Sequence, residues 1–263
     1  CTIGYGGHAR QILKELSSNG KLIGIDKDEE AIKFCKKSLS AYSNIQLFHN
    51  SYHKINDILS ISKTRKVDGM LLDLGLSSAQ LDSKARGFSY KIDSELDMRF
   101  DLSQKFKAND LLNSASKKDI ADIIFKYSDE RRSRAIASSI FKMRPIKNVF
   151  ELVEAIRRST PPKNRKKTLA RVFQAIRIVV NNELSILENF LSEFCRQLSI
   201  GGRIVFISFH SLEDRIVKRA LKDLSLKKKV KILTKKPIYP SQKENYLNKR
   251  SRSAKLRAAE RIS

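Results

Sequence analysis

The stretch Gly4-Tyr5-Gly6-Gly7-His8, followed by the apolar run Leu22-Ile23-Gly24-Ile25-Asp26, decides the fold class of this chain. A glycine-rich turn leading into a helix, and then a strand that ends in an acid, is how open α/β sheets hold a ribose-bearing cofactor. Glycine lets the backbone approach a ligand closely, and a carboxylate at Asp26 would accept hydrogen bonds from ribose hydroxyls. The stretch therefore predicts an α/β sheet and offers a candidate cofactor site.

Three interpretations of this stretch stay open on these residues alone. Gly4, Gly6 and Ala9, with Asp26 downstream, satisfy the dinucleotide fingerprint in its alanine variant. A Gly-x-Gly-Gly turn equally suits S-adenosylmethionine, which has a ribose but no pyrophosphate. The third interpretation is a turn that closes a strand–helix junction and binds nothing.

Composition limits the class of protein. With 263 residues, 41% hydrophobic and 31% charged, the chain is long enough for one large or two modest domains. No apolar run approaches the roughly 20 residues that span a bilayer, and no signal peptide is visible, so we expect a cytoplasmic protein without a membrane partner. Cys1, Cys35 and Cys195 are far apart, so no metal site or disulfide framework is predicted.

The positive charge is clustered. The net charge is +25, and residues 216–263 hold 16 basic residues against 3 acids. Residues 157–171 hold seven basic residues and no acid. Such clusters indicate a polyanion partner, and nucleic acid is favoured over a membrane surface because no basic helix with a large aromatic face accompanies them. The predicted RNA contacts are Arg165, Lys166, Lys167, Arg171, Lys249, Arg250 and Arg252.

Hydrophobic patterning divides the chain. Short apolar runs at 22–25, 45–48 and 70–72 alternate with helical stretches, as in a parallel sheet covered by helices. From about Ser103 only helical spacing is found, which predicts an all-helical insertion at 104–168 within a discontinuous core of 1–103 plus 169–263.

Further elements are expected after the insertion. One long amphipathic helix should carry an apolar stripe from Val172 to Leu198, and the strand at 204–208 should resume the sheet. Residues 227–236 are predicted to form a basic loop, and 255–262 an edge strand.

Several longer segments closely resemble the bacterial 16S ribosomal RNA cytosine-N4 methyltransferases. They cover nearly the whole chain in family order: Gly4–His8, Asp73–Asp82, Arg86–Ser89, Leu96–Arg99, Phe173–Ile178 with Asn181, Glu183 and Leu184, Ser208–Arg219 and Arg250–Arg257. The resemblance implies a class I S-adenosylmethionine-dependent methyltransferase fold (Rossmann-like) with a helical domain for RNA recognition. It also implies methylation of the exocyclic amine of one cytosine in the decoding region of small-subunit rRNA.

The family's cofactor positions fall on Gly6, Gly7, His8, Asp26, Tyr52, Asp73 and Gln80. Tyr52 stands where the family more often has Phe, and it keeps an aromatic face for adenine. The family's acid before the glycine turn would precede Cys1, so we expect the first strand to lie upstream of this sequence. Residues 168–171 read Thr-Leu-Ala-Arg where relatives read Pro-Ala-Thr-Arg, which keeps Arg171 but leaves the local contact open.

Two residues are candidates for the proton transfer that accompanies methylation of an amine. Asp73 follows the third visible strand, and His210 follows the strand at 204–208. An acceptor beside the amine helps by drawing its proton away. The structural alternatives are a turn cap for Asp73 and a helix cap for His210. Phe88 and Tyr90 are either stacking partners of a flipped base or packing residues.

Two rival functions remain beside the methyltransferase. An NAD-type oxidoreductase would explain the glycine turn and Asp26, but it leaves the clustered charge unused. A non-catalytic rRNA-binding or assembly protein would explain the charge but not the turn. The sequence does not decide between monomer and dimer.

Overall fold

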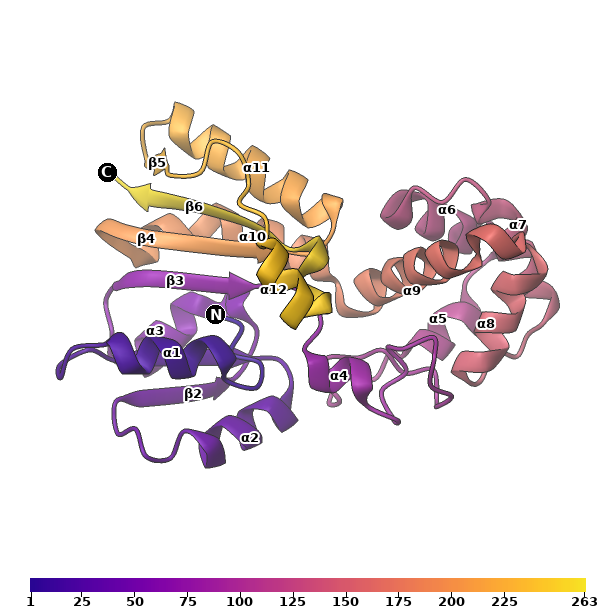
Figure 1. Ribbon diagram of the computed structural model, residues 1–263, viewed down its shortest axis with the longest axis horizontal. Helices are drawn as coiled ribbons and strands as arrows, with labels where there is room; N and C mark the ends of the chain where they lie inside the picture. The colour runs from indigo at the N-terminus through magenta and orange to yellow at the C-terminus, as the bar shows by residue number, and fades with distance from the viewer. The chain divides into compact units, whose positions relative to one another are not determined.

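The computed structural model describes residues 1–263 and divides the chain into two compact units (Figure 1). Cys1–Gly75 and Leu184–Ser263 form the first, called here the sheet unit. Leu76–Glu183 form the second, called the helical unit. None of the helices combines the length and the apolar character needed to cross a membrane.

The strands of the sheet unit are mostly parallel. β1 (Leu22–Asp26) pairs in parallel with β2 (Ile45–His49), and β3 (Val67–Asp73) pairs in parallel with β4 (Leu198–Ser208). This confirms the strands predicted at 22–25, 45–48, 70–72 and 204–208. Their parallel pairing places Asp26 and His49 at one strand end, and Asp73 beside Ile207 at the other pair's carboxyl end.

The first three residues lie between these two strand pairs. Ile3 N–H donates to Ile25 O at 2.9 Å, and Cys1 N donates to Leu71 O at 2.8 Å. Thr2 Oγ1 accepts the N–H of Asp73 at 2.7 Å. Residues 1–3 therefore connect β1 to β3 and carry the chain directly into the glycine turn.

Two predictions for the C-terminal part of the sheet were wrong. β6 (Lys255–Arg261) is an interior strand, antiparallel to β4 on one side and to β5 (Val230–Ile232) on the other, so the order is β3-β4-β6-β5. It is interior because 227–236, predicted as a loop, contains β5. The apolar Val230 is 1% exposed and supplies the outer strand.

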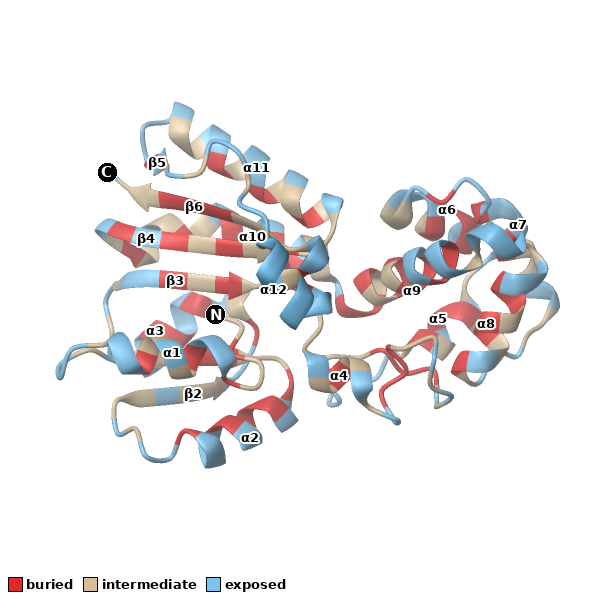
Figure 2. Cartoon of the chain, viewed as in Figure 1, coloured by how far each residue is buried: buried red, intermediate tan, exposed pale blue.

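Most helices of the sheet unit pack on the strands through buried apolar residues, whereas the helix Gln242–Leu247 has no buried residue (Figure 2). Phe190 and Phe194 of α10 stack on each other at 5.8 Å, and both meet Phe206 of β4 edge-on. A smaller cluster joins α1 and α2 through Leu13, Cys35 and other side chains. The helices of this unit are α1 (Gly7–Glu15), α2 (Glu29–Ser38), α3 (Ile55–Ile61), α10 (Glu183–Gln197), α11 (Ser211–Leu226) and α12 (Gln242–Leu247), with short 3-10 turns at Tyr52–Lys54 and Lys249–Ser253.

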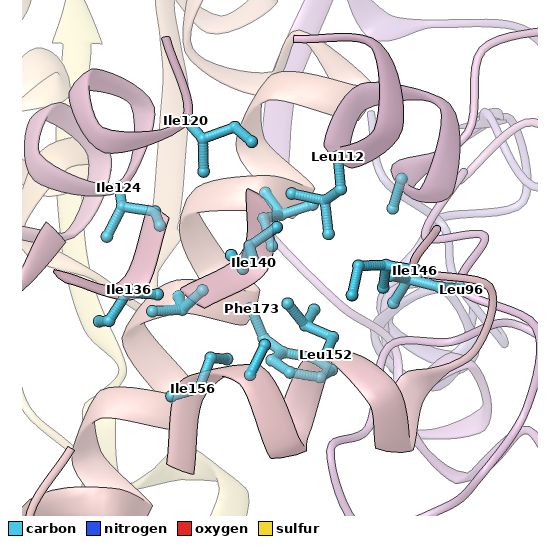
Figure 3. Packing of buried hydrophobic residues seen from close by; sticks show 14 of the residues in the cluster. Leu96, Leu112, Ile120, Ile124, Ile136, Ile140, Ile146, Leu152, Ile156 and Phe173 are labelled. Carbon is cyan, nitrogen blue, oxygen red and sulfur yellow. The ribbon is translucent and has the colours of Figure 1, made fainter. Parts of the chain in front are cut away.

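The helical unit has a core of its own, built almost wholly from aliphatic side chains (Figure 3). Ile124, Ile136 and Ile140 are fully buried there, and Phe173 of the longest helix lies among them. The elements are α4 (Ser78–Asp82), α5 (Ala108–Ser114), α6 (Lys117–Ser128), α7 (Ser133–Lys142), α8 (Val149–Arg158), a 3-10 turn at Pro162–Asn164 and α9 (Arg165–Asn181).

The helical unit is larger than the predicted insertion at 104–168. Phe173 and Ile176 of α9 belong to its core. Asn181 also donates to Met98 O at 2.7 Å and accepts the N–H of Phe100 at 2.7 Å. These bonds tie the end of α9 to residues 98–100, so α9 belongs to the helical unit, whose boundaries fall at residues 76 and 183.

The single long helix predicted through Val172 and Leu198 was also wrong. It is interrupted at Asn182, which adopts a left-handed conformation with φ 52° and ψ 39° and ends α9. Asn is one of the few side chains that tolerate this region, so it serves as a helix stop in place of glycine. The residues of the predicted apolar stripe are buried or partly buried, but those on α9 pack in the core of the helical unit and those on α10 pack in the core of the sheet unit.

Candidate cofactor site

The glycine turn Gly4–Gly7 is shaped by backbone that only glycine adopts easily. Gly4 and Gly6 have φ of 50° and 79°, and Gly6 is the N-cap of α1. A Cβ at Gly4 or Gly7 would meet no atom within 4 Å, whereas a Cβ at Gly6 would lie 3.2 Å from Cys35 Sγ. The turn thus packs against α2 at Gly6 and leaves open space beside Gly4 and Gly7.

Asp26 holds this turn against the end of β1. Its Oδ2 accepts the N–H of Gly4 at 2.8 Å, and its Oδ1 accepts the N–H of Asp28 at 3.0 Å. Burial raises the pKa of Asp26, while the two backbone hydrogen bonds oppose the rise. Because each carboxylate oxygen has a second lone pair, Asp26 retains the capacity to accept from ribose hydroxyls.

Two supporting residues were missed in the sequence. The thiol of Cys35 donates to Gly4 O at 3.2 Å, and burial raises the pKa of this thiol to about 11, with the charge of Asp26 adding to the rise. Thr2 supports the end of β3 through its hydroxyl. A lone Cys in an apolar helical stripe and a Thr two residues before a glycine give no signal that would reveal these roles.

Asp73 faces His8 at the end of β3. His8 Nε2 lies 3.4 Å from Asp73 Oδ2, and this hydrogen bond raises the pKa of His8 against the effect of partial burial. Asp73 Oδ1 is buried and has no hydrogen-bond partner. A buried carboxylate oxygen with no partner is unusual, and since the side chain as a whole is 33% exposed, it marks Asp73 as a functional candidate.

The other two predicted cofactor residues have different surroundings. Tyr52 is half-buried, and its ring meets Phe190 edge-on at 5.4 Å, which fixes the orientation of the aromatic plane. Gln80 lies in the helical unit, where it closes a capping box on α4. Its Oε1 accepts the N–H of Ser77 at 3.0 Å, and its own N–H donates to Ser77 Oγ at 3.1 Å.

His210 is the N-cap of α11. Its Nδ1 accepts the N–H of Glu213 at 3.4 Å, and its Nε2 lies 3.2 Å from Glu213 Oε1. Glu213 Oε2 accepts the N–H of Phe209 at 3.0 Å. The structure thus supplies, through Nδ1, the helix-capping role that was the structural alternative for His210, whereas Nε2 is buried and makes no hydrogen bond.

Other motif residues prove to be internal supports. Asp97 is paired with Arg99 at 2.7 Å, and Arg86 donates to the carbonyls of Arg99 and Phe100. Burial acts against ionisation of Asp97, but the hydrogen bonds and charge of Arg99 hold its pKa below the usual value. In the sheet unit Arg257 of β6 binds Asp214 of α11 at 2.7 Å.

The aromatic candidates Phe88 and Tyr90 differ in exposure. Phe88 is 5% exposed and stacks on Phe100 at 5.6 Å, so it is a packing residue and the base-stacking alternative is wrong for it. Tyr90 is half-buried, with its ring edge-on to Phe173 at 5.8 Å.

The predicted RNA contacts are mostly solvent-exposed. Lys166, Lys167 and Arg171 project from α9, and Arg171 lies 3.6 Å from Glu130. Arg165 is half-buried and donates to Thr160 O at 3.1 Å. The remaining three, Lys249, Arg250 and Arg252, are exposed on the 3-10 turn at Lys249–Ser253 of the sheet unit.

These features fit S-adenosylmethionine. A glycine turn with open space beside it, an acid at the end of the next strand and a free acceptor on Asp73 lie at the carboxyl ends of β1 and β3. Together with the mixed sheet, they define a class I S-adenosylmethionine-dependent methyltransferase, as predicted.

Comparison with known proteins identifies the family. The chain matches the MraW methylase family over residues 1–262 and belongs to it. It is 48% identical to the Ribosomal RNA small subunit methyltransferase H of Thermosipho africanus, over 100% of this chain and 90% of that protein. The protein of the same name from Caldicellulosiruptor saccharolyticus is 47% identical, over 99% and 91%. Membership confirms the predicted enzyme class and cofactor and removes the oxidoreductase and non-catalytic alternatives.

Proposed function

We propose that this methylase transfers a methyl group from S-adenosylmethionine to the exocyclic N4 amine of a cytosine in the decoding region of 16S rRNA. The observation that carries the proposal is the candidate cofactor site, in which Asp26 is bonded to the glycine turn, in a chain with a net charge of +25. Its relatives are named as small-subunit rRNA methyltransferases, and the motifs resemble cytosine-N4 enzymes. The substrate would be the small ribosomal subunit or its rRNA, in the cytoplasm.

The cofactor residues have separable tasks in this proposal. The sulfonium of the cofactor supplies an activated methyl group. Asp26 would accept hydrogen bonds from the ribose hydroxyls, the backbone of Gly6 and Gly7 would lie against the cofactor, and the ring of Tyr52 would pack on adenine. Because methyl transfer is a direct displacement, the main contribution of these residues is alignment.

Asp73 is the better candidate for the proton of the reacting amine. Its free Oδ1 accepts the N4–H hydrogen bond, which raises the electron density on the attacking nitrogen. His8 keeps Asp73 oriented through Oδ2. His210 is a weaker candidate because its Nδ1 already caps α11 and its side chain is only 8% exposed.

The test is methyl incorporation into small subunits that lack this modification. With labelled S-adenosylmethionine, we expect one methyl group, mapped by mass spectrometry of rRNA fragments to N4 of a decoding-region cytosine. Asp73→Asn should lower the rate by about 100-fold, in the range of general acid–base contributions. Methylation at carbon or at another base, or no methylation of any rRNA substrate, would contradict the proposal.

A further inference from the structure

A groove of about 520 Å³ on the helical unit combines aromatic and basic side chains. It lies within one unit, between the start of α9, one face of α8 and the segment that contains Tyr90. Six of its lining residues carry the chemistry: Tyr90, Lys91, Phe150, Arg157, Arg165 and Lys166.

The fold presents these side chains as a consequence of how α8 packs. Phe150 and Arg157 are seven residues apart, two helical turns, so they share one face of α8. Leu152 and Ile156 on the other side are fully buried in the core (Figure 3). Phe150 is 47% exposed although it belongs to a helix with an otherwise well-buried apolar face.

Contacts with neighbouring residues of the helical unit fix the orientation of the aromatic and basic groups that line the groove. The ring of Tyr90 rests edge-on against buried Phe173, with an interplanar angle of 76°. Arg165 is anchored by its bond to Thr160 O. The N–H of Phe150 donates to Asp93 Oδ1 at 3.1 Å, which fixes the first turn of α8.

The positive charge of the groove is not neutralised within the protein. Glu154, on the same face of α8, is bound to Arg158 at 3.0 Å, and Glu130 is bound to Thr168 and Arg171. No ion pair engages Lys91, Arg157 or Lys166. Cations left free around an exposed aromatic face are the elements with which proteins hold single-stranded nucleic acid.

We propose that this groove binds an unpaired nucleotide segment of the RNA substrate. A base stacks on Phe150 with Tyr90 beside it, and Arg157, Lys91 and Lys166 contact the flanking phosphates. The proposal rests on the proposed function for its choice of RNA, and it adds a recognition site outside the cofactor cradle. Stacking tolerates every base, so the groove holds the strand without reading its sequence.

The first test uses the full chain and a fluorescein-labelled pentauridylate in an anisotropy titration. Phe150→Leu, which keeps an apolar side chain but no aromatic face, should weaken binding about tenfold. Phe150→Tyr should bind like the unaltered protein. Phe125→Leu is the matched control, because Phe125 is 56% exposed on α6 and does not line the groove. Since both Phe side chains are exposed, equal melting temperatures are expected for all variants.

A site-resolved measurement separates the groove from the other basic surfaces. Pentanucleotides that contain 4-thiouridine should crosslink to peptides carrying Phe150 or Tyr90. Arg157→Gln should also reduce the slope of log K against log salt by about 0.7, one single-strand phosphate contact. Unchanged affinity of Phe150→Leu, or crosslinks confined to other peptides, would overturn the proposal.

Methylation assays keep the two proposals distinguishable. Phe150→Leu should raise the KM for small subunits about tenfold, with kcat and the affinity for S-adenosylmethionine unchanged. If rRNA is not methylated at all but pentauridylate binding still depends on Phe150, the groove stands and the proposed function fails. If methylation proceeds and the Phe150 variants behave alike, the groove proposal alone fails.

Discussion

The carboxylate of Asp26 does two things at once. It is bonded to the N–H groups of Gly4 and Asp28, and it is buried enough that its pKa is raised. A raised pKa means that the ionised form is disfavoured in the folded protein, so Asp26 lowers stability at neutral pH relative to a solvated carboxylate. A buried carboxylate that lowers stability, as Asp26 does, is expected where its charge is needed to bind a ligand, here the cofactor ribose.

Asp26→Asn should therefore weaken binding of S-adenosylmethionine at least tenfold, because a hydrogen bond to a charged group contributes about 1.5–3 kcal/mol. Isothermal titration calorimetry measures the change. Asp28→Asn makes the same change of charge two residues away. Asp28 is the N-cap of α2, a position that Asn fills equally well, so this control should keep full affinity. Equal losses in both variants would show that the turn is merely sensitive to charge.

His8 offers a pH-dependent test of its contact with Asp73. Its pKa is raised by the hydrogen bond to Asp73, so its contribution to stability is fully present below pH about 6.5, the usual value. That contribution is lost as pH rises through the higher pKa of the folded state. An NMR titration of the free protein should give a pKa above 6.5 for His8, and Asp73→Asn should bring it down toward that value. A pKa of His8 that does not respond to Asp73→Asn would show that the two side chains do not interact in solution.

At the scale of elements, the break between α9 and α10 depends on Asn182. Its left-handed conformation is strained for most side chains by about 1–2 kcal/mol. Asn182→Ala should accordingly lower the free energy of unfolding by about 1 kcal/mol, and Asn182→Gly should not lower it. At Asn189, exposed in the middle of α10, the order should reverse, because glycine is about 1 kcal/mol worse than alanine inside a helix. Denaturant titrations of the four variants give the comparison, and the same order at both sites would contradict a capping role.

The elements also show what local sequence can and cannot predict. The strands β1 and β3 end in acids and β2 ends in polar residues, and the apolar runs of the three strands were sufficient to place them. The interior position of β6 was not predictable, because seven residues of mixed charge give no sign of which strands flank them. The split of the stripe between α9 and α10 was missed for a related reason. An Asn in the left-handed region is compatible with helical periodicity on both sides of it.

For the whole molecule, the resemblance of motifs predicted the family and its cofactor, whereas the glycine turn and Asp26 alone left three interpretations open. Within the motifs, the sequence did not distinguish residues that bind the cofactor or substrate from residues that only stabilise the fold. Asp214 and Arg257 form an ion pair that connects segments 43 residues apart, whereas Asp97 pairs with Arg99 only two residues further on. Such pairs are indistinguishable from binding residues until the fold brings the partners together.

The charge of the whole chain leads to the last prediction. We expect both basic segments, Arg165–Lys167 of α9 and Lys249–Arg252 of the sheet unit, to contact rRNA phosphates. Replacing Arg165, Lys166 and Lys167 by Gln should weaken binding of the ribosomal substrate and reduce its salt slope by about one counterion per lost contact. Replacing Lys249, Arg250 and Arg252 should act similarly, and the affinity for S-adenosylmethionine should remain unchanged in both variants.

The decisive control removes the same charge from a surface with no predicted contact. Lys33, Lys36 and Lys37 are exposed on α2, so replacing them by Gln also lowers the net charge by three. If only long-range attraction matters, all three triple variants should lose affinity equally, because each changes the total charge by the same amount. If phosphates are bound locally, the α2 variant should keep the full salt slope. The combined six-residue variant should then lose the sum of the two slopes, since contacts at separate sites release their counterions independently.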